Sequence, residues 1–298
     1  MIYNNPNPEQ QHYNQKVAVV TGSSSGIGYE TALLLARNGF YTYATMRNLN
    51  KAKEIIENAK NNSLPLKVLE LDVTSDRSVS ESIADIYRES GRIDVIVNNA
   101  GYALVGAVED LSMEELRAQF ETNFFGAVRV TKAVLPQMRK QKSGTIVNIT
   151  SMGGRIAIPL DPGYHATKFA LEGLSESMQY ETRPFGIRII VIEPGVVNTN
   201  FYGGSLKMAK MSVDPSNPSP YSQMLQGLEK AAGQMVKSSI PPTEVAKVIV
   251  NAVSFDNPDF RYIVGDDAVQ LLEAAKKISD RELREAIEQR FFSQRQVE

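Results

Sequence analysis

Short runs of apolar and β-branched residues alternate along the chain with longer segments whose apolar residues recur at helical spacing. The first run, at 16–21, leads through a glycine-containing turn into a segment of helical length that ends at Gly39. Further runs predict strands at 40–45, 66–71, 93–98, 145–150, 187–192 and 260–264. Strands that alternate with helices form a parallel sheet with helices on both faces. We therefore predict an α/β, doubly wound (Rossmann) fold of about seven strands.

Helices are predicted at 29–38, 50–60, 76–89 and 243–253, and one or two more over 266–292. Ser112 and Glu115 have the spacing of a capping box, and Pro162 stands where a first helical turn accepts proline. The segment 201–239 breaks the rhythm with glycines, prolines and many polar residues, so we expect a long irregular insertion that serves as a substrate lid. We expect a polar N-terminal extension over 1–15 and a single domain over 16–298.

Composition and charge narrow the class of protein. The 298 residues are 42% hydrophobic and 22% charged, as in ordinary soluble domains. A net charge of -2, without a cluster of basic residues, argues against a nucleic-acid partner. The chain has no cysteine, so it has no disulfide, thiolate nucleophile or cysteine zinc site, which suits a reducing cytoplasm. The apolar runs are far shorter than the roughly 20 residues of a membrane span, so we expect a cytoplasmic protein without a transmembrane segment.

Three glycines, Gly22, Gly26 and Gly28, lie between the first predicted strand and the first helix. Glycine at such a turn lets the backbone approach a pyrophosphate at the helix N-terminus. The spacing Gly-x-x-x-Gly-x-Gly differs from the common Gly-x-Gly-x-x-Gly fingerprint, and many glycine-rich turns are only turns. The motif alone therefore leaves cofactor binding and a simple turn about equally favoured.

Tyr164 and Lys168 are four residues apart, which places both side chains on one face of a predicted helix. A nearby cation favours the tyrosinate and lowers a phenol pKa from its ordinary value of about 10, so the pair is a candidate acid and base. The alternative is an exposed pair without function, since 12 tyrosines make this spacing common by chance. His165 points roughly 100° away from Tyr164 and is expected to be structural or at the pocket rim.

Several motifs occur together and in a particular order: the turn Thr21-Gly-x-x-x-Gly-Ile-Gly28, then Asn98-Asn99-Ala100-Gly101, Asn123, Ser151, Tyr164, Lys168 and Pro194-Gly195. In this order and spacing the chain resembles the short-chain dehydrogenases/reductases over about 16–201. The stretch 43–47 is more similar to the hydroxysteroid and retinol dehydrogenase-like branch than to the acyl-carrier reductases.

The resemblance implies an oxidoreductase and assigns a role to four side chains. Tyr164 would donate a proton to a carbonyl during reduction and act as base during alcohol oxidation. Lys168 would hold the nicotinamide ribose and lower the pKa of Tyr164, and Ser151 would hydrogen-bond the substrate oxygen. Asn123 would anchor a water that links Lys168 to solvent.

The resemblance also implies a bound nicotinamide dinucleotide. Its pyrophosphate end would lie on the glycine turn, at Gly22, Ser24, Ser25, Gly26, Ile27 and Gly28. Asp72 and Val73 would lie beside the adenine, and the backbone of Asn99, Ala100 and Gly101 beside the adenine ribose. The nicotinamide would be held on its carboxamide side by Pro194, Gly195, Val197 and Thr199, and through its ribose by Tyr164 and Lys168.

The end of the second strand bears on the choice of cofactor. An NAD site places a carboxylate there for the ribose 2′-hydroxyl, but this chain has Thr45, followed two residues later by Arg47. A guanidinium pairs well with a 2′-phosphate. We therefore expect NADP(H), with NAD(H) as the alternative if Arg47 is only a solvated surface residue.

The expected substrate is a lipophilic carbonyl or alcohol, because the candidate pocket residues Tyr102, Met152, Ile156, Ile158 and Leu160 are mostly apolar. Those assigned to substrate contact are Ser151, Met152, Ile158 and Tyr164. Four methionines of the 201–239 segment also suit an adaptable apolar surface, although they are at least as well explained by packing of the lid.

With two histidines and no cysteine, we predict no metal.

A catalytically silent NADP(H)-binding sensor of the same fold is the alternative function. The presence of Asn123, Ser151, Tyr164 and Lys168 argues against it, because a sensor would be free to lose them. The resemblance further implies a homodimer or homotetramer, formed through the long helices that contain Asn123 and Tyr164.

Overall fold

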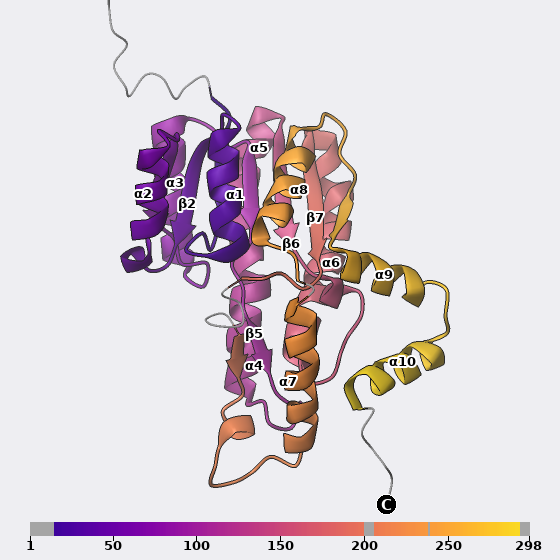
Figure 1. Cartoon of the computed structure of the whole chain (residues 1–298). Helices are drawn as coiled ribbons and strands as arrows, with labels where there is room; N and C mark the ends of the chain where they lie inside the picture. The colour runs from indigo at the N-terminus through magenta and orange to yellow at the C-terminus, as the bar shows by residue number, and fades with distance from the viewer. Residues whose placement is uncertain (1–14, 200–205, 238, 293–298) are drawn as a thin grey trace, which may run out of the picture.

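Seven parallel strands form the main sheet of the protein, in the order β3-β2-β1-β4-β6-β7-β9. The computed structural model describes residues 15–199, 206–237 and 239–292. From β1 the chain moves outward through β2 to β3, then returns to β4 on the other side of β1 and continues outward to β9 (Figure 1). The strands are β1 (Val17–Val20), β2 (Tyr41–Met46), β3 (Leu66–Glu70), β4 (Val95–Asn98), β6 (Gly144–Ile149), β7 (Ile187–Pro194) and β9 (Arg261–Val264). The prediction of a doubly wound sheet is confirmed.

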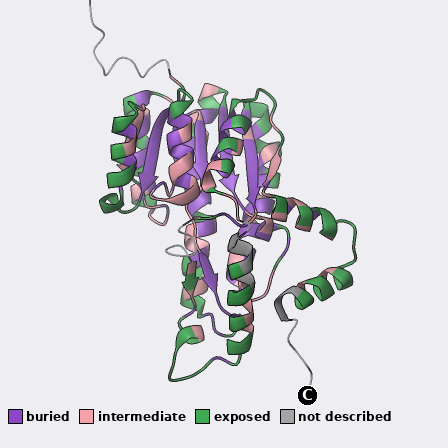
Figure 2. Ribbon diagram, in the orientation of Figure 1, coloured by how far each residue is buried: buried purple, intermediate pink, exposed green. Residues whose placement is uncertain are grey.

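Helices cover both faces of this sheet. One apolar cluster joins a sheet face to α1 (Gly26–Arg37), α2 (Lys53–Asn61) and α8 (Pro242–Ser254). A second joins the opposite face to α3 (Asp76–Ser90), α5 (Gly126–Gln141) and α6 (Pro162–Thr182). Because side chains alternate along a strand, β1 contributes Ala18 and Val20 to the first cluster and Val17 and Val19 to the second. Figure 2 shows the resulting buried strands and the exposed outer faces of the helices.

The sequence signals for helix ends are also confirmed. Helix α4 (Met113–Phe120) begins with a capping box, in which Glu115 N donates to Ser112 Oγ and Ser112 N donates to the Glu115 carboxylate. Helix α6 begins at Pro162. Between α4 and α5 the chain continues as a π-helical turn, Glu121–Phe125. Residues 266–292 form two helices, α9 (Asp266–Ala275) and α10 (Asp280–Phe292).

The expectation of an irregular insertion over 201–239 is wrong for the described part of that segment. Strand β8 (Leu206–Met208) pairs in parallel with β5 (Ala103–Val105), and α7 (Ser222–Lys237) follows. The three prolines of the segment all lie in the connection between β8 and α7 and interrupt neither. Met208 and Met224 pack on a small apolar cluster with Leu225, so these two methionines fix the segment to the fold.

Two predicted segments lie wholly or partly outside the described residues. Residues 1–14 of the expected N-terminal extension lie there, as do 200–205 and 238 of the expected lid. Within the part of the chain that the structure describes, no helix is both long and apolar enough to cross a membrane.

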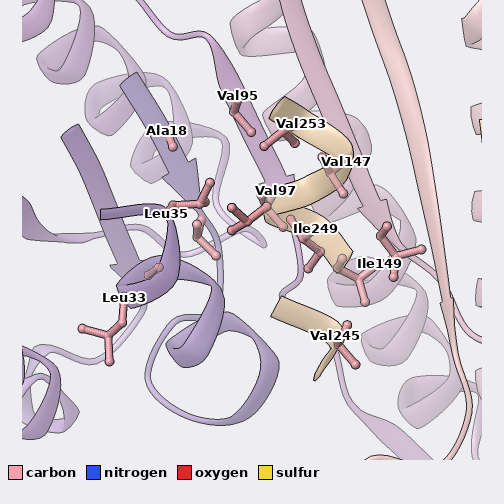
Figure 3. Close-up of a cluster of buried hydrophobic side chains, with 14 of the residues drawn as sticks. Ala18, Leu33, Leu35, Val95, Val97, Val147, Ile149, Val245, Ile249 and Val253 are labelled. Atoms are coloured by element: carbon pink, nitrogen blue, oxygen red, sulfur yellow. The ribbon is translucent and has the colours of Figure 1, made fainter. Parts of the chain in front are cut away.

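The contact between α8 and the sheet provides a test of the core. Ile249 is 0% exposed and lies with Val245 and Val253 against strand valines and isoleucines (Figure 3). We expect Ile249→Ala to lower the free energy of unfolding by about 2–5 kcal/mol, because it leaves a cavity in a packed interior. Urea unfolding measures this loss. The matched control is Ile56→Ala on α2, where the side chain is 48% exposed; an equal loss in both variants would contradict this account of the core.

Candidate active site

A cavity of about 390 Å³ lies at the carboxyl ends of the strands, where the strand order reverses between β1 and β4. In open α/β sheets this position is the usual ligand site, and the volume is within the range of small-molecule pockets. The cavity brings together nearly all the residues singled out in the sequence: Gly22, Ser24, Ser25, Gly26, Ile27, Arg47, Asp72, Val73, Asn99, Ala100, Gly101, Ser151, Met152, Ile158, Tyr164, Lys168, Pro194, Gly195, Val197 and Thr199. Gly28, Asn123 and Leu160 are outside this lining. Leu160, expected to be a pocket residue, instead packs in a small apolar cluster with Val105 and Leu225.

The glycine turn is packed tightly against the loop that follows β4. Gly22 has a φ of +67°, and a Cβ there would lie 2.9 Å from Cα of Ala100. A Cβ on Gly28 would lie 2.4 Å from Nδ2 of Asn99. Gly28 thus packs behind the cavity wall and lets the first turn of α1, at Gly26 and Ile27, face the cavity. A helix N-terminus with glycines in this arrangement fits a bound pyrophosphate.

Hydrogen bonds tie the loops after β1 and β4 together. Thr21 Oγ1 accepts from the backbone N–H groups of Asn99 and Ala100, at 3.0 and 3.1 Å. The Asn99 amide in turn donates to the carbonyl oxygens of Thr21 and Gly22, at 2.9 and 3.2 Å. Both loops therefore keep a fixed separation at the edge of the cavity.

Arg47 and Asp72 line another part of the cavity, beyond the ends of β2 and β3. Asp72 Oδ1 accepts from the backbone N–H and the hydroxyl of Thr74, at 2.9 and 2.8 Å. Arg47 is exposed, and none of the ion pairs in the described part of the chain includes it. Burial raises the pKa of Tyr102, and the positive charge of nearby Arg47 opposes that shift. The Arg47 guanidinium is thus available to an anionic ligand.

Ser151, Tyr164 and Lys168 meet in the cavity from two directions. Ser151 follows β6, and its Oγ accepts from Gly153 N at 3.0 Å and makes a long contact of 3.4 Å to the carbonyl of Pro194. Tyr164 and Lys168 come from α6, with Lys168 Nζ 5.5 Å from the centre of the tyrosine ring. Nζ also donates to the carbonyl oxygen of Ile149 at 2.8 Å, which fixes Lys168 between α6 and the end of β6.

Lys168 is held in a buried position, with a relative exposure of 6%. This burial lowers the pKa of the ammonium from 10.5 to about 8, and Glu172, one helical turn farther along, partly opposes the shift. A lysine with such a pKa is largely charged at neutral pH and releases its proton more readily than a solvated one.

His165 was expected to be structural or at the pocket rim, and it both lines the cavity and holds the neighbouring loop. Its Nδ1 lies 2.8 Å from the carbonyl oxygen of Gly153, and its Nε2 accepts from Ile158 N at 3.1 Å. Burial lowers the pKa of His165, which favours the neutral ring that can donate at one nitrogen and accept at the other. The ring therefore fixes the loop between β6 and α6, which carries Met152 and Ile158 along the cavity.

Asn123 lies in the π-helical turn Glu121–Phe125, and its side chain is buried behind the cavity. Its Oδ1 accepts from Tyr102 N at 3.0 Å, and its Nδ2 donates to Tyr102 O at 2.8 Å and to Thr167 Oγ1 at 3.2 Å. These bonds connect the loop after β4 to α6. The predicted water between Lys168 and solvent stays a prediction.

Three acidic or basic residues at or beside the cavity were not identified as site residues from the sequence. Asp267 accepts a hydrogen bond from Val196 N at 2.8 Å and packs so closely on Gly195 that no Cβ would fit there. Asp266 and Asp267 form the acidic first turn of α9. The hydrogen bond between Asp267 and the 195–196 loop is a long-range contact. Lys207 and Asp161 line the cavity itself, which Asp267 does not. Only Asp161, three residues before Tyr164, carried a sequence signal.

A doubly wound sheet, a glycine turn at its switch point and a Ser-Tyr-Lys cluster in one cavity define a Rossmann-type protein with an oxidoreductase site. The model of the short chain dehydrogenase family matches residues 16–209, and the chain belongs to this family. It is an oxidoreductase of that family.

Curated relatives agree with the hydroxysteroid and retinol dehydrogenase-like branch. Human retinol dehydrogenase 8 is 40% identical over 253 residues, which cover 83% of this chain and 80% of the relative. Mouse 17-beta-hydroxysteroid dehydrogenase type 1 is 35% identical over 259 residues, which cover 83% and 72%.

Solved structures have the same fold. A short-chain dehydrogenase from Streptomyces avermitilis is similar with a TM-score of 0.78 and 35% identity, covering 91% of this chain and 96% of the other. An alcohol dehydrogenase from the archaeon Thermococcus sibiricus, solved with 5-hydroxy-NADP, has a TM-score of 0.69 and 29% identity, with 84% and 96% covered.

The burial of Lys168 predicts a pH dependence of stability for the cofactor-free protein. The folded chain releases the Lys168 proton near pH 8, whereas the unfolded chain holds it to about pH 10.4, so the unfolded state binds more protons in between. Stability should therefore rise with pH across this window, by up to about 3 kcal/mol relative to Lys168→Met, which has no proton to release. Urea unfolding at a series of pH values measures the difference.

Lys168→Arg is the matched control, because its guanidinium stays charged throughout this window. Parallel pH profiles for the wild type and Lys168→Met would contradict the lowered pKa.

Proposed function

We propose that the protein is an NADP(H)-dependent oxidoreductase that interconverts a carbonyl and an alcohol on a lipophilic small molecule. The observation that carries this proposal is the convergence of Ser151, Tyr164 and Lys168 on one cavity with the glycine turn. The bound cofactor would supply or accept the hydride. A silent cofactor sensor of the same fold is not favoured, since relatives that cover most of the chain are named dehydrogenases.

The roles of the three side chains follow from their environments. Tyr164 would donate its hydroxyl proton to the substrate oxygen during reduction and remove it during oxidation. Lys168, charged and 5.5 Å from the tyrosine ring, would stabilise the tyrosinate form and bind the ribose hydroxyls of the cofactor. Ser151 would exchange its long contact with the Pro194 carbonyl for a hydrogen bond to the substrate oxygen, where negative charge develops.

The preference for NADP(H) rests on Arg47. Its guanidinium forms no ion pair with the described residues, and Arg47 lines the cavity beyond the end of β2, where the ribose 2′-phosphate would lie. The Thermococcus sibiricus relative, which was solved with an NADP derivative, supports a nicotinamide dinucleotide at this site. Glycine-turn contacts would be shared by both cofactors, so Arg47 is the residue that distinguishes them.

The apolar part of the cavity supports a lipophilic substrate. Met152, Ile156 and Ile158 line it from the loop between β6 and α6, and Leu206 and Leu228 line it from β8 and α7. Two relatives are named for retinol and for hydroxysteroids, which are both largely apolar alcohols. A long or polycyclic hydrocarbon with one reacting oxygen would match such a lining.

We also propose a homodimer or homotetramer formed through the helices that follow Asn123 and contain Tyr164. Phe125, at the start of α5, is 47% exposed, and Phe169 on α6 is 45% exposed. Exposed aromatic side chains on long helices are suited to a subunit interface.

The first test is NADPH oxidation, followed at the nicotinamide absorbance band, against ketones, aldehydes and oxo-steroids. We expect turnover by the wild type and a loss of about 100-fold or more in kcat for Tyr164→Phe, with NADPH binding retained, because only the transferred proton is removed. Tyr180→Phe, also on α6 but 68% exposed, should keep full activity. Tight NADPH binding without turnover on the whole panel would favour the sensor, and failure to bind either nucleotide would refute the role of the glycine turn.

Arg47→Ala tests the choice of cofactor. We expect its affinity for NADPH to fall about 10- to 100-fold, because a charge-assisted pair with the 2′-phosphate is lost, while its affinity for NADH stays unchanged. Fluorescence titration of both nucleotides measures this. Arg37→Ala, which removes an exposed arginine at the far end of α1, serves as the control. An equal loss for NADPH and NADH would show that Arg47 does not read the 2′-phosphate.

A further inference from the structure

Asp161 is placed to cap α6 but does not do so. It immediately precedes the helix, where an aspartate normally accepts a hydrogen bond from a backbone N–H of the first turn. Here its side chain makes no such bond. Its Oδ1 is buried and has no hydrogen-bond partner among the residues that the structure describes. The carboxyl is therefore not used to hold the helix end.

Asp161 is also part of the cavity wall. It lines the cavity together with Tyr164, which follows three residues later on α6. The neighbouring lining residues along the chain, Ile158 and Pro159, are apolar. Asp161 is thus a polar group in the apolar part of the cavity, near the residue that would transfer the proton.

Burial without a partner is unfavourable for a carboxyl group, and a native protein usually pairs such an atom. Burial also raises the pKa of Asp161 well above its ordinary value, which favours the neutral acid over the carboxylate. A neutral carboxyl group has both a hydrogen to donate and an oxygen to accept. Both capacities would be satisfied by one ligand group that also donates and accepts.

We propose that Asp161 binds a hydroxyl group of the substrate, close to the carbonyl that is reduced, and so selects hydroxylated ketones over plain ones. This inference rests on the proposed function, because it assigns a substrate class to the same cavity. A hydroxyl fits better than an ammonium group, since Arg47, Lys168 and Lys207 already give the cavity three cationic side chains. A second carboxylate would be a poor partner for Asp161, because two acids would compete for one proton.

The test compares a straight-chain ketone with hydroxyketones of the same chain, the hydroxyl being moved one carbon at a time away from the carbonyl. With NADPH, we expect the wild type to show a kcat/KM about ten-fold higher for the best hydroxyketone than for the plain ketone. Asp161→Leu should lose this preference, mainly through a higher KM for the hydroxyketone, so that its kcat/KM values for the two ketones become equal. Asp161→Asn, whose amide still donates and accepts, should restore part of the preference.

Thermal unfolding separates this role from a structural one. Because Asp161 makes no cap bond, Asp161→Leu should leave Tm unchanged or raise it. A lower Tm together with a loss of activity on the plain ketone would make Asp161 a structural residue and overturn the proposal. Equal kcat/KM values across the series in the wild type, or an unchanged preference in Asp161→Leu, would also overturn it.

The proposed reaction and the proposed hydroxyl site can be refuted by separate measurements. If the wild type reduces none of these ketones, binding of the ketone and the hydroxyketones to the NADPH-loaded protein is measured by the nicotinamide fluorescence. Tighter binding of a hydroxyketone that disappears in Asp161→Leu would support the hydroxyl site, even though the proposed reaction would be wrong. Equal binding of all the ketones would overturn the hydroxyl site.

Discussion

The close packing of the loops after β1 and β4 is the contact on which the site depends. Thr21 and Asn99 exchange hydrogen bonds across the point where the strand order reverses, and the Asn99 amide fills the space that a side chain at position 28 would need. Glycine at 22 and 28 is thus a steric requirement of the fold itself. The same packing sets the distance between the N-terminus of α1 and the rest of the cavity.

The position of α6 is fixed by bonds to backbone carbonyl and amide groups. His165 holds Gly153 and Ile158, and Lys168 holds the carbonyl of Ile149. Tyr164, which immediately precedes His165 on the helix, is thereby held in a fixed position relative to Ser151. Because these partners are backbone atoms of the fold, the relative position of Ser151 and Tyr164 depends little on the side chains that line the apolar part of the cavity.

The sequence was sufficient for the main sheet and for the residues around the glycine turn, because strand periodicity and motif spacing are local signals. It was insufficient for β5, β8 and α7. Two of these are strands of three residues, and the prolines near α7 hid its regular apolar spacing. Asp267 lies 71 residues from its partner Val196, and the missing cap bond of Asp161 is visible only in three dimensions. Such contacts leave no trace in local patterns.

The small apolar cluster of Val105, Leu160 and Leu225 is separate from the two large clusters on the sheet faces. Residues packed on it, Leu206 and Leu228, also line the cavity. Substitutions there would reshape the pocket without disturbing the main core or the bonds that hold α6. A new substrate preference could therefore evolve in this small cluster while the stability of the sheet stayed intact, which makes the cluster the natural region to exchange when specificity is engineered.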